Sequence, residues 1–425
     1  MLLRFEATNH RSIAEPIEIS MVAVDEDRPS VHHFERLSES VLTVAGIYGP
    51  NASGKSTILD ALAWIGAAVE RSLRSWEDVV PREPFRFRGG PDEPSMYEVE
   101  LVVAGVRYIY RVEVDDSSVM FEGLYSFPLG KRRTLFEREG SNLQFRRGLV
   151  GVSGTRELLT PTTLALSAAM RVGDREVRDF GRSLTTIRTL GLRRRNRWRG
   201  FGYGISPMQT ARLFEEPSPQ ESLFDDGEME LNETRDAALA LLRFADLGIN
   251  DVVVTDDQVE PGAPKRDRRA LQFTHRAANQ DLPFDLEDES EGTRTWFRLI
   301  GPVLSALRRG RILLFDEIDA SLHPRLSARL LDLFQDPETN PLGAQLVFTT
   351  HDTSLLNHLN RDEVWLTEKG TNGATTLTAL AEYGGDKVRR SMNLERAYLQ
   401  GRFGAVPELD QYLLKRALGL ATPGD

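Results

Sequence analysis

The sequence lacks cysteine altogether, and it lacks any long apolar run. Without cysteine the chain forms no disulfide, offers no thiol nucleophile and cannot ligate a metal through sulfur. No apolar stretch approaches the roughly 20 residues that a membrane-spanning helix needs. The first residues, MLLRFEATNHRSIAEP, also lack the basic, apolar and small-residue layout of a secretory signal. We therefore expect a soluble, cytoplasmic protein without a membrane partner.

Positive charge is the scarcer sign in this chain. With 53 Lys and Arg against 64 Asp and Glu, the net charge is −11. This balance disfavours general electrostatic coating of nucleic acid, although a local basic patch can still bind it. The 425 residues exceed the ~100–200 of one domain, so we expect two or three domains.

The residue pattern along the chain changes twice. Residues 1–170 contain short apolar or alternating segments that predict strands, with one helix over about 55–72. Residues 171–285 are richer in charge and mainly helical in pattern, and include a basic run followed by an acidic one. Residues 286–425 alternate apolar strands with helices, which predicts a parallel sheet. The expected fold is α/β, with an N-terminal mixed or antiparallel β lobe, a parallel-sheet core and a mainly helical insertion.

One short loop carries a phosphate-binding pattern. GPNASGKST, residues 49–57, fits G-x-x-x-x-G-K-[ST] and stands between an apolar strand and a helix, as that motif requires. Backbone N–H groups of such a loop, with the positive end of the following helix, can hold phosphate oxygens. The alternative is a chance match on a glycine turn. The residues concerned are Gly49, Pro50, Asn51, Ala52, Ser53, Gly54, Lys55, Ser56 and Thr57.

A second element supports the phosphate loop. RILLFDEIDASLHP, residues 311–324, ends an apolar strand in Asp316 and Glu317. Helix capping would account for one of these acids, but hardly for both of them beside Asp319. The carboxyl end of a strand is where an open parallel sheet binds its ligands. A first carboxylate can hold Mg²⁺ through water, and the next can polarise an attacking water.

Two further segments come in a consistent order along the chain. ESEGT, residues 289–293, places Ser290 and Gly292 at a helix N-terminus suited to an anion, and TTHD, residues 349–352, places His351 at the end of a strand. Taken singly, Ser290 reads as an ordinary N-cap and His351 as a satisfied polar residue. Their order relative to the loop and the acids points instead to a nucleotide site.

Together these segments resemble a known family. The sequence is similar to the ABC-type ATPase heads of the SMC and RecF class. It resembles more closely the AAA family ATPases of the RloA/AbiL type from bacterial restriction and phage-defence loci, to which the PARIS ATPase is also similar. The matching stretches are NHRSI, GPNASGKST, ESEGT, LLFDEIDASLHP, QLVFTTHD and YLQGRFGAVP.

The resemblance implies an ABC-type P-loop NTPase head with ATP and Mg²⁺ as cofactors. Residues 1–170 would be ATPase lobe I with the Walker A loop, and 171–285 the insertion. Residues 286–425 would be ATPase lobe II with the signature, Walker B, D-loop and H-loop. In this family ATP lies between two protomers, so the resemblance also implies a homodimer or a higher homo-oligomer.

Residue roles follow from the same resemblance. Lys55 and Ser56 would bind phosphates and Mg²⁺, and Asp316 would support the Mg²⁺. Glu317 would be the general base, and His351 would sense the γ-phosphate. A final group would lie at the interface with the other subunit: Ser290 and Gly292, which resemble the signature, and Asp319, which resembles the D-loop.

The sequence departs from the family pattern in three respects. Only the serine and the second glycine of the usual signature have counterparts in ESEGT. A Q-loop glutamine is not identified, although Gln272 is available. The insertion is too short for the long coiled coil of an SMC protein.

A basic segment in the insertion suggests nucleic acid as a partner. Arginines beside aromatic rings can bind phosphates and stack on bases. A solvated charged face, or pairing with the acidic run LFDDGEME, explains the segment at least as well. The residues are Arg188, Arg193, Arg194, Arg195, Arg197 and Arg199, with Trp198, Phe201 and Tyr203 nearby.

Three functions are consistent with these features. The resemblance favours a sensor or regulator in phage defence that controls a toxic effector encoded nearby, such as a Toprim-type nuclease. A RecF-like or SMC-like DNA repair or replication ATPase is the first alternative, and an ATP-locked regulatory scaffold with incidental turnover is the second. No separate hydrolase motif is visible, and His32–His33 read as surface residues rather than metal ligands.

Overall fold

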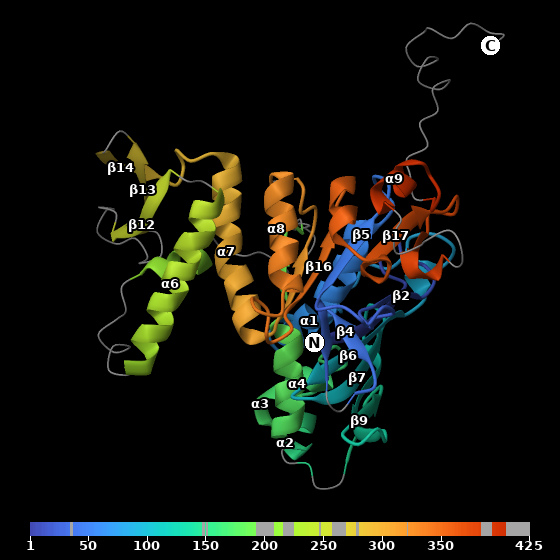
Figure 1. Ribbon diagram of the computed structural model, residues 1–425. Helices are drawn as coiled ribbons and strands as arrows, with labels where there is room; N and C mark the ends of the chain where they lie inside the picture. The colour runs from blue at the N-terminus through green and yellow to red at the C-terminus, as the bar shows by residue number, and fades with distance from the viewer. Residues whose placement is uncertain are drawn as a thin grey trace, which may run out of the picture.

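The computed structural model describes most of the chain and leaves short gaps. The described residues are 1–34, 37–146, 149, 152–192, 208–215, 225–245, 248–256, 269–277, 280–320, 322–383 and 393–404. They form a head with a parallel core sheet and an antiparallel sheet, and a smaller unit that includes α6 and three strands lies beside the head (Figure 1). Among the described helices, none is both long and apolar enough to cross a membrane.

The core sheet brings together strands from both ends of the chain. Its order is β11-β15-β16-β5-β17-β18, and every pairing is parallel except that of β17 with β18. The strands are β5 (Val44–Tyr48), β11 (Arg188–Leu190), β15 (Ile312–Phe315), β16 (Gln345–Thr349), β17 (Val364–Lys369) and β18 (Thr375–Ala379). The parallel sheet expected from residues 286–425 is therefore confirmed, with β5 from the N-terminal region inserted between β16 and β17.

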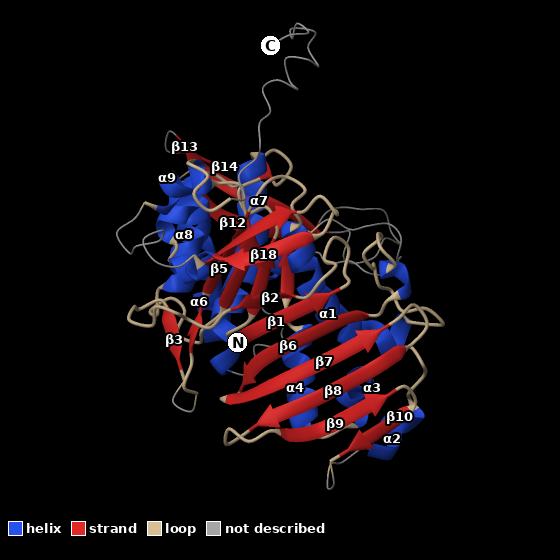
Figure 2. Cartoon of the chain, turned by 90° about the vertical axis from the view of Figure 1, so that its right-hand side faces the viewer, coloured by secondary structure: helices blue, strands red, loops and turns tan. Residues whose placement is uncertain are grey.

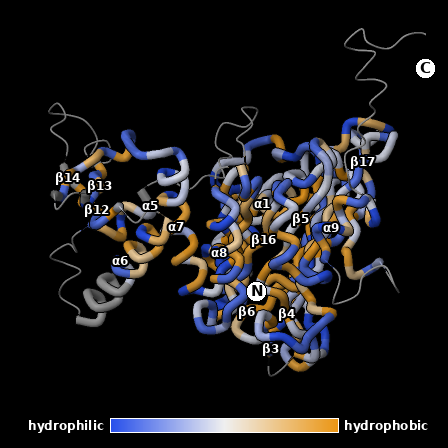
Figure 3. Tube along the Cα trace, turned by 45° about the horizontal axis from the view of Figure 1, so that its top comes forward, coloured by the Kyte–Doolittle hydropathy of each residue, from blue (hydrophilic) through white to orange (hydrophobic). Residues whose placement is uncertain are grey.

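Both faces of the core sheet are buried. Along β15, Ile312 and Leu314 join one apolar core, whereas Leu313 and Phe315 join the other. Strands covered on both sides need continuous apolar sequence rather than alternation, which explains the run ILLF. Figure 3 shows hydrophobic segments gathered in the interior around β5 and β16.

The antiparallel sheet is formed by residues 2–145 alone. Its order is β10-β9-β8-β7-β6-β1-β2, and Figure 2 shows it with α1, α3 and α4 behind it. The strands are β1 (Leu2–Thr8), β2 (Ile17–Ser20), β6 (Ser95–Val103), β7 (Val106–Val114), β8 (Val119–Phe127), β9 (Arg133–Glu139) and β10 (Asn142–Phe145). A separate hairpin joins β3 (Val31–His33) to β4 (Ser40–Leu42).

Helix α1 (Lys55–Ser75) connects the two sheets. It contacts β1 of the antiparallel sheet, β15 and β16 of the core sheet, and helices α3 (Ala165–Val172) and α4 (Arg175–Thr185). Two thirds of its residues are buried, including apolar positions on all sides. A helix that is apolar all round belongs in a core. The α/β head expected from the sequence is thus the observed architecture.

The region 171–285 differs in part from the mainly helical pattern expected there. After α4, Arg188–Leu190 forms β11 and pairs in parallel with β15. Strands β12 (Ile249–Asp256), β13 (Arg269–Ala277) and β14 (Gln280–Asp285) form a small antiparallel sheet. In β13, buried Leu271 and Phe273 alternate with half-buried neighbours, which is the period of a strand.

The remaining helices complete the layers. Helix α7 lies between the core and the small unit of α6 and β12–β14 (Figure 1). After β16, Thr353–His358 forms a short 3-10 helix. The bounds are α2 (Val152–Glu157), α5 (Met208–Ala211), α6 (Asp225–Ala245), α7 (Glu291–Arg309), α8 (Pro324–Gln335) and α9 (Leu394–Leu399).

Candidate nucleotide-binding site

The phosphate loop turns sharply from β5 into α1. Gly49 and Gly54 have φ values of 146° and 108°, which side-chain-bearing residues rarely adopt. A Cβ at Gly54 would collide with the Thr375 side chain, and one at Gly49 with Thr367. The Thr375 hydroxyl donates to the Ser53 carbonyl at 2.8 Å, so β17 and β18 fix the loop from outside. Both glycines of the motif are therefore sterically required.

Lys55 occupies the centre of this loop. Its side chain is buried, and Nζ donates to the carbonyl oxygens of Gly49 at 2.8 Å and Pro50 at 3.1 Å. Burial lowers the pKa of Lys55 from 10.5 to about 8, against the opposing effect of three nearby carboxylates. Within the described part of the chain the ammonium thus donates to backbone carbonyls alone, and a phosphate group would supply the compensating charge.

The acids at the end of β15 are held by β16. Thr349 Oγ1 donates to Asp316 Oδ1 at 2.7 Å, and the Glu317 N–H donates to the same Thr349 hydroxyl at 2.7 Å. Glu317 itself has φ 54°, a left-handed value that is uncommon for a residue with a side chain. Its side chain is exposed, whereas Asp316 is buried. The two carboxylates therefore sit in different environments on adjacent residues.

Asp319 and His351 lie beside these acids. Asp319 Oδ1 accepts from Thr350 Oγ1 at 2.7 Å and from the His351 N–H at 3.2 Å. Burial, and then the charge of Lys55, lower the pKa of His351 below 6.5, while the nearby carboxylates act in the opposite direction. His351 is therefore mainly neutral at pH 7.

The structure brings most of the expected residues together in one cleft. Its lining includes Lys55 and Ser56 of the phosphate loop, Asp316 and Glu317 after β15, and His351 after β16. These segments meet because β15, β16 and β5 are neighbours in parallel register, so their carboxyl ends share one edge. The cleft has a volume of about 1820 Å³, more than the ~300–1,000 Å³ of most small-molecule pockets.

Ser290 and Gly292 lie elsewhere. They stand exposed at the start of α7, where Ser290 Oγ accepts from the Thr293 N–H at 3.1 Å as an N-cap, and neither residue lines the cleft. Arg188 lies on β11 and donates to the Thr185 carbonyl at 3.3 Å. The other members of the basic and aromatic segment lie outside the described residues: Arg193, Arg194, Arg195, Arg197, Trp198, Arg199, Phe201 and Tyr203.

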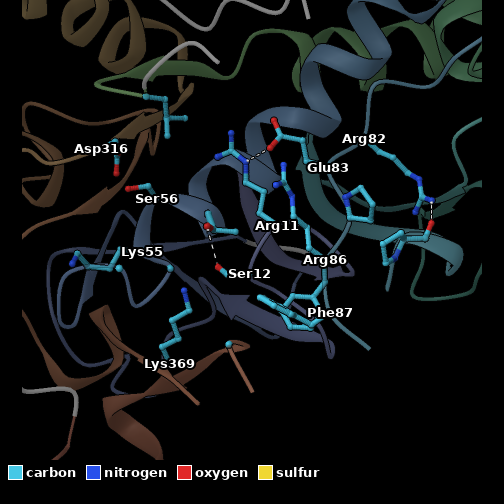
Figure 4. A pocket seen from close by; sticks show the side chains of 18 of the residues that line it. Arg11, Ser12, Lys55, Ser56, Arg82, Glu83, Arg86, Phe87, Asp316 and Lys369 are labelled. Atoms are coloured by element: carbon cyan, nitrogen blue, oxygen red, sulfur yellow. Dashed lines mark hydrogen bonds and ion pairs between the residues drawn. The ribbon is translucent and has the colours of Figure 1, made fainter. Parts of the chain in front are cut away.

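Several lining residues were not assigned a role from the sequence. Arg11 and Ser12, from NHRSI, line the cleft, and the Ser12 hydroxyl donates to Oγ1 of Thr57 in the phosphate loop at 3.2 Å. Phe87 and Lys369 line the same cleft (Figure 4). The NHRSI segment was a recognisable signal in the sequence. Nothing in the sequence relates Phe87 or Lys369 to the phosphate loop, because both residues lie far from that loop along the chain.

The donor set fits Mg²⁺ bound together with phosphates. The described residues contain no group of three or more acidic or histidine side chains that would hold a metal by itself. Mg²⁺ usually takes one or two protein ligands and completes its shell with phosphate oxygens and waters. The Ser56 hydroxyl and the Asp316 carboxylate, both lining the cleft, are ligands of this kind.

The parallel sheet, the phosphate loop and the acids at its edge define a P-loop nucleotide-binding head. The family model described as "AAA domain, putative AbiEii toxin, Type IV TA system" matches residues 44–357, and the chain belongs to this family. The match includes the loop, both acids and His351. The narrower RloA/AbiL group remains an expectation. No curated protein matches the sequence.

Three of the solved structures that are similar to this chain are SMC heads. One is an SMC head bound to the C-winged helix domain of ScpA, with 14% identity, a TM-score of 0.46 and coverage of 89% of this chain and 97% of that one. Another is the SMC head domain from Thermotoga maritima, with 13% identity, a TM-score of 0.39 and coverage of 89% and 98%. A third, from Pyrococcus furiosus and bound to the C-terminal domain of ScpA, has 13% identity, a TM-score of 0.41 and coverage of 90% and 97%.

Proposed function

We propose that this protein binds ATP with Mg²⁺ in the cleft and hydrolyses it to ADP and phosphate. The observation that carries the proposal is the meeting of Lys55, Asp316 and Glu317 on one cleft, although they lie far apart in the sequence. A phosphate-holding loop and two carboxylates at one edge of a parallel sheet suit phosphoryl transfer, which needs positioning and charge stabilisation more than covalent chemistry.

Each residue has a role that its surroundings support. The loop N–H groups and the N-terminus of α1 would hold the phosphates, and Lys55 would exchange its two carbonyl partners for phosphate oxygens. Ser56 and Asp316 would hold Mg²⁺, which neutralises charge on the β- and γ-phosphates when bound. Exposed Glu317 would accept the proton of the attacking water. Neutral His351 would donate a hydrogen bond to the γ-phosphate.

The site would be completed by a second copy of the chain. Ser290 and Gly292 are exposed at a helix N-terminus and lie outside the cleft of their own chain, so they are free to meet the nucleotide of a partner. Asp319 accepts a hydrogen bond from the His351 N–H and would contact the partner's residues. ATP would then join two heads, and hydrolysis would release them.

The biological role we propose is regulation in a bacterial phage-defence system. The support is the sequence resemblance to ATPases of defence loci and the family description, which names an "AbiEii toxin" and a "Type IV TA system". ATP turnover would control the release of a toxic effector, such as a nuclease encoded nearby.

The activity is tested by measuring phosphate release from ATP and Mg²⁺. Glu317→Gln should lower turnover by about 10²- to 10⁴-fold while ATP still binds. Light scattering should show the variant accumulating as an ATP-dependent dimer. Glu338→Gln, at an exposed site outside the cleft, is the matched control and should match the parent. Turnover of Glu317→Gln at the parental rate would show that Glu317 is not the base.

The defence role needs a cellular test. Bacteria carrying the gene with its neighbours, or with Glu317→Gln in its place, would be challenged with phage and plaques counted. Protection that depends on both the neighbour and Glu317 supports the proposal. Equal plaque numbers with and without the genes, together with ATP-dependent binding to DNA ends or gaps, would favour the repair alternative.

A further inference from the structure

We propose that the Phe87 ring is the platform on which the base of the bound nucleotide stacks, with Arg86 and Lys369 at its sides. This inference rests on the proposed nucleotide binding and adds a base-recognition surface to it. The proposed surface lies in the part of the cleft beyond the phosphate loop. Figure 4 shows Arg86 and Phe87 there, on the side away from Asp316 and Ser56.

The exposure of Phe87 is the first observation. Its side chain is 60% exposed, whereas Phe85, two residues earlier on the same loop, is 4% exposed and packs its ring at 5.5 Å from that of Phe87. The loop therefore buries one ring as an anchor and presents the other. Exposed single phenylalanines also occur at Phe244 and Phe284, but neither of those lines the cleft.

The distance from the phosphate loop suits one nucleotide. A Cβ on Gly54 would collide with Thr375, so β18 touches the phosphate loop. A Cβ on Gly373 would lie 3.3 Å from the Phe87 ring, so the turn just before β18 lies close to Phe87. Gly373 and Thr375 are two positions apart in the sequence, a separation that spans at most about 7 Å. The ring and the phosphate loop thus flank the same short hairpin.

The charges around the ring favour a polyanion with a base. Arg86 and Lys369 are exposed, and within the described part of the chain neither has an ion-pair partner. Arg11, by contrast, is paired with Asp60 at 3.0 Å and with Glu83 at 3.3 Å. Two cations without ion-pair partners, lining the same cleft as an exposed aromatic ring, match the triphosphate and the flat base of a nucleotide.

Asn9 is the positioning residue for this platform. Its Oδ1 accepts from the Phe85 N–H at 2.8 Å, and its Nδ2 donates to the carbonyls of Gly90 and Glu93, both at 2.8 Å. The buried amide of Asn9 therefore closes both ends of the loop that carries Phe87. Asn9 adopts φ 52°, and asparagine is among the few side-chain-bearing residues that tolerate this conformation.

The test compares two ligands that differ by the base. ATP and inorganic tripolyphosphate would be titrated, each with Mg²⁺, into the parent, Phe87→Ala, Phe87→Trp and Asn9→Ala. Phe87→Ala should weaken ATP binding by about 5- to 100-fold, the loss expected for one base–aromatic stack, and leave tripolyphosphate binding unchanged. Phe87→Trp keeps an aromatic ring and should retain the parental affinity for ATP. Asn9→Ala should lower the affinity for ATP more than the affinity for tripolyphosphate. Phe244→Ala, which removes an exposed ring elsewhere, should match the parent.

The outcomes separate this inference from the proposed function. If the parent binds neither ligand, the nucleotide site itself is wrong. If the parent binds ATP and Phe87→Ala binds it equally well, the stacking platform is wrong and the proposed function stands. An equal loss for ATP and tripolyphosphate also overturns the inference, because Phe87 would then only shape the phosphate loop. Thermal melting of each variant shows whether the substitution has left the head folded.

Discussion

The hydroxyl of Thr349 forms hydrogen bonds with both the Asp316 carboxylate and the Glu317 backbone N–H. Oγ1 donates to Asp316 Oδ1 and accepts from the Glu317 N–H, each at 2.7 Å. A single side chain at the end of β16 therefore fixes the carboxylate proposed to hold Mg²⁺ and the backbone of the proposed base. The left-handed φ of Glu317 is maintained by this bond together with its place in the sheet edge.

Thr349→Val should disturb both acids without changing the volume of the buried side chain. Asp316 and the Glu317 N–H would each lose a partner, and a buried polar group without a partner costs about 1–3 kcal/mol. We expect a lower free energy of unfolding in urea and a higher Mg²⁺ concentration for half-maximal ATP turnover. Thr349→Ser keeps the hydroxyl and should restore both quantities. Unchanged Mg²⁺ dependence in Thr349→Val would show that Asp316 needs no such support.

ATP binding should take up a proton above about pH 8. The free Lys55 loses its proton as the pH rises through about 8, because burial has lowered its pKa. Phosphates would raise that pKa again, so binding at higher pH must reprotonate the amine. Affinity should then fall by at most about tenfold per pH unit above 8.

Calorimetry in buffers of different ionisation enthalpy measures this uptake. The apparent binding enthalpy should depend on the buffer near pH 9 and hardly at all near pH 7. His351→Ala is the control, because the pKa of His351 is lowered and the ring is already neutral in this range. Loss of the buffer dependence in His351→Ala, or a buffer-independent enthalpy in the parent near pH 9, would contradict the assignment to Lys55.

The sequence predicts those parts of the site that depend on local order. Gly54 and Lys55 follow an apolar strand and open a helix, and Asp316 ends an apolar strand, so short segments suffice to place them at a sheet edge. The parallel register that joins these segments follows from strand–helix–strand order.

Other parts depend on contacts that no local pattern reveals. Phe87 reaches the cleft on a loop that Asn9 holds by hydrogen bonds from a distant position in the sequence. Strand β14 was missed because its sequence, QDLPFD, is short, polar and contains Pro283, which suits an edge strand but is unfavourable within a sheet. Strand β11 lies in the region expected to be mainly helical, since its three residues are too few for the alternation of a strand to show.

Replacing Arg193, Arg194, Arg195 and Arg197 with alanine should weaken any nucleic-acid binding in a salt-dependent manner. For each phosphate that is no longer neutralised, the slope of log K against log salt should become shallower by about 0.7–0.9. Fluorescence anisotropy with labelled DNA and RNA over a range of salt concentrations measures both affinity and slope. Lysine at the same four positions keeps the charge and should retain most of the binding. Unchanged binding in the alanine variant, or none in the parent, would exclude nucleic acid as a partner of this segment.

A mixing experiment tests whether Ser290 acts on the nucleotide of a partner. Lys55→Ala should abolish phosphate binding, and Ser290→Asp keeps the N-cap of α7 while placing a negative charge where the γ-phosphate would lie. Each variant alone should be inactive as a homodimer. In a mixed dimer, the Lys55 of one chain and the Ser290 of the other form one intact site.

Random mixing in equal amounts should therefore restore about a quarter of the parental ATP turnover. If Ser290 instead served the nucleotide of its own chain, both chains of the mixed dimer would remain defective and no activity would return. Retained activity in Ser290→Asp alone would show that the start of α7 lies away from the nucleotide in every assembly. Because the two variants carry their changes on opposite sides of the same interface, the recovered fraction reports directly on which chain completes the site.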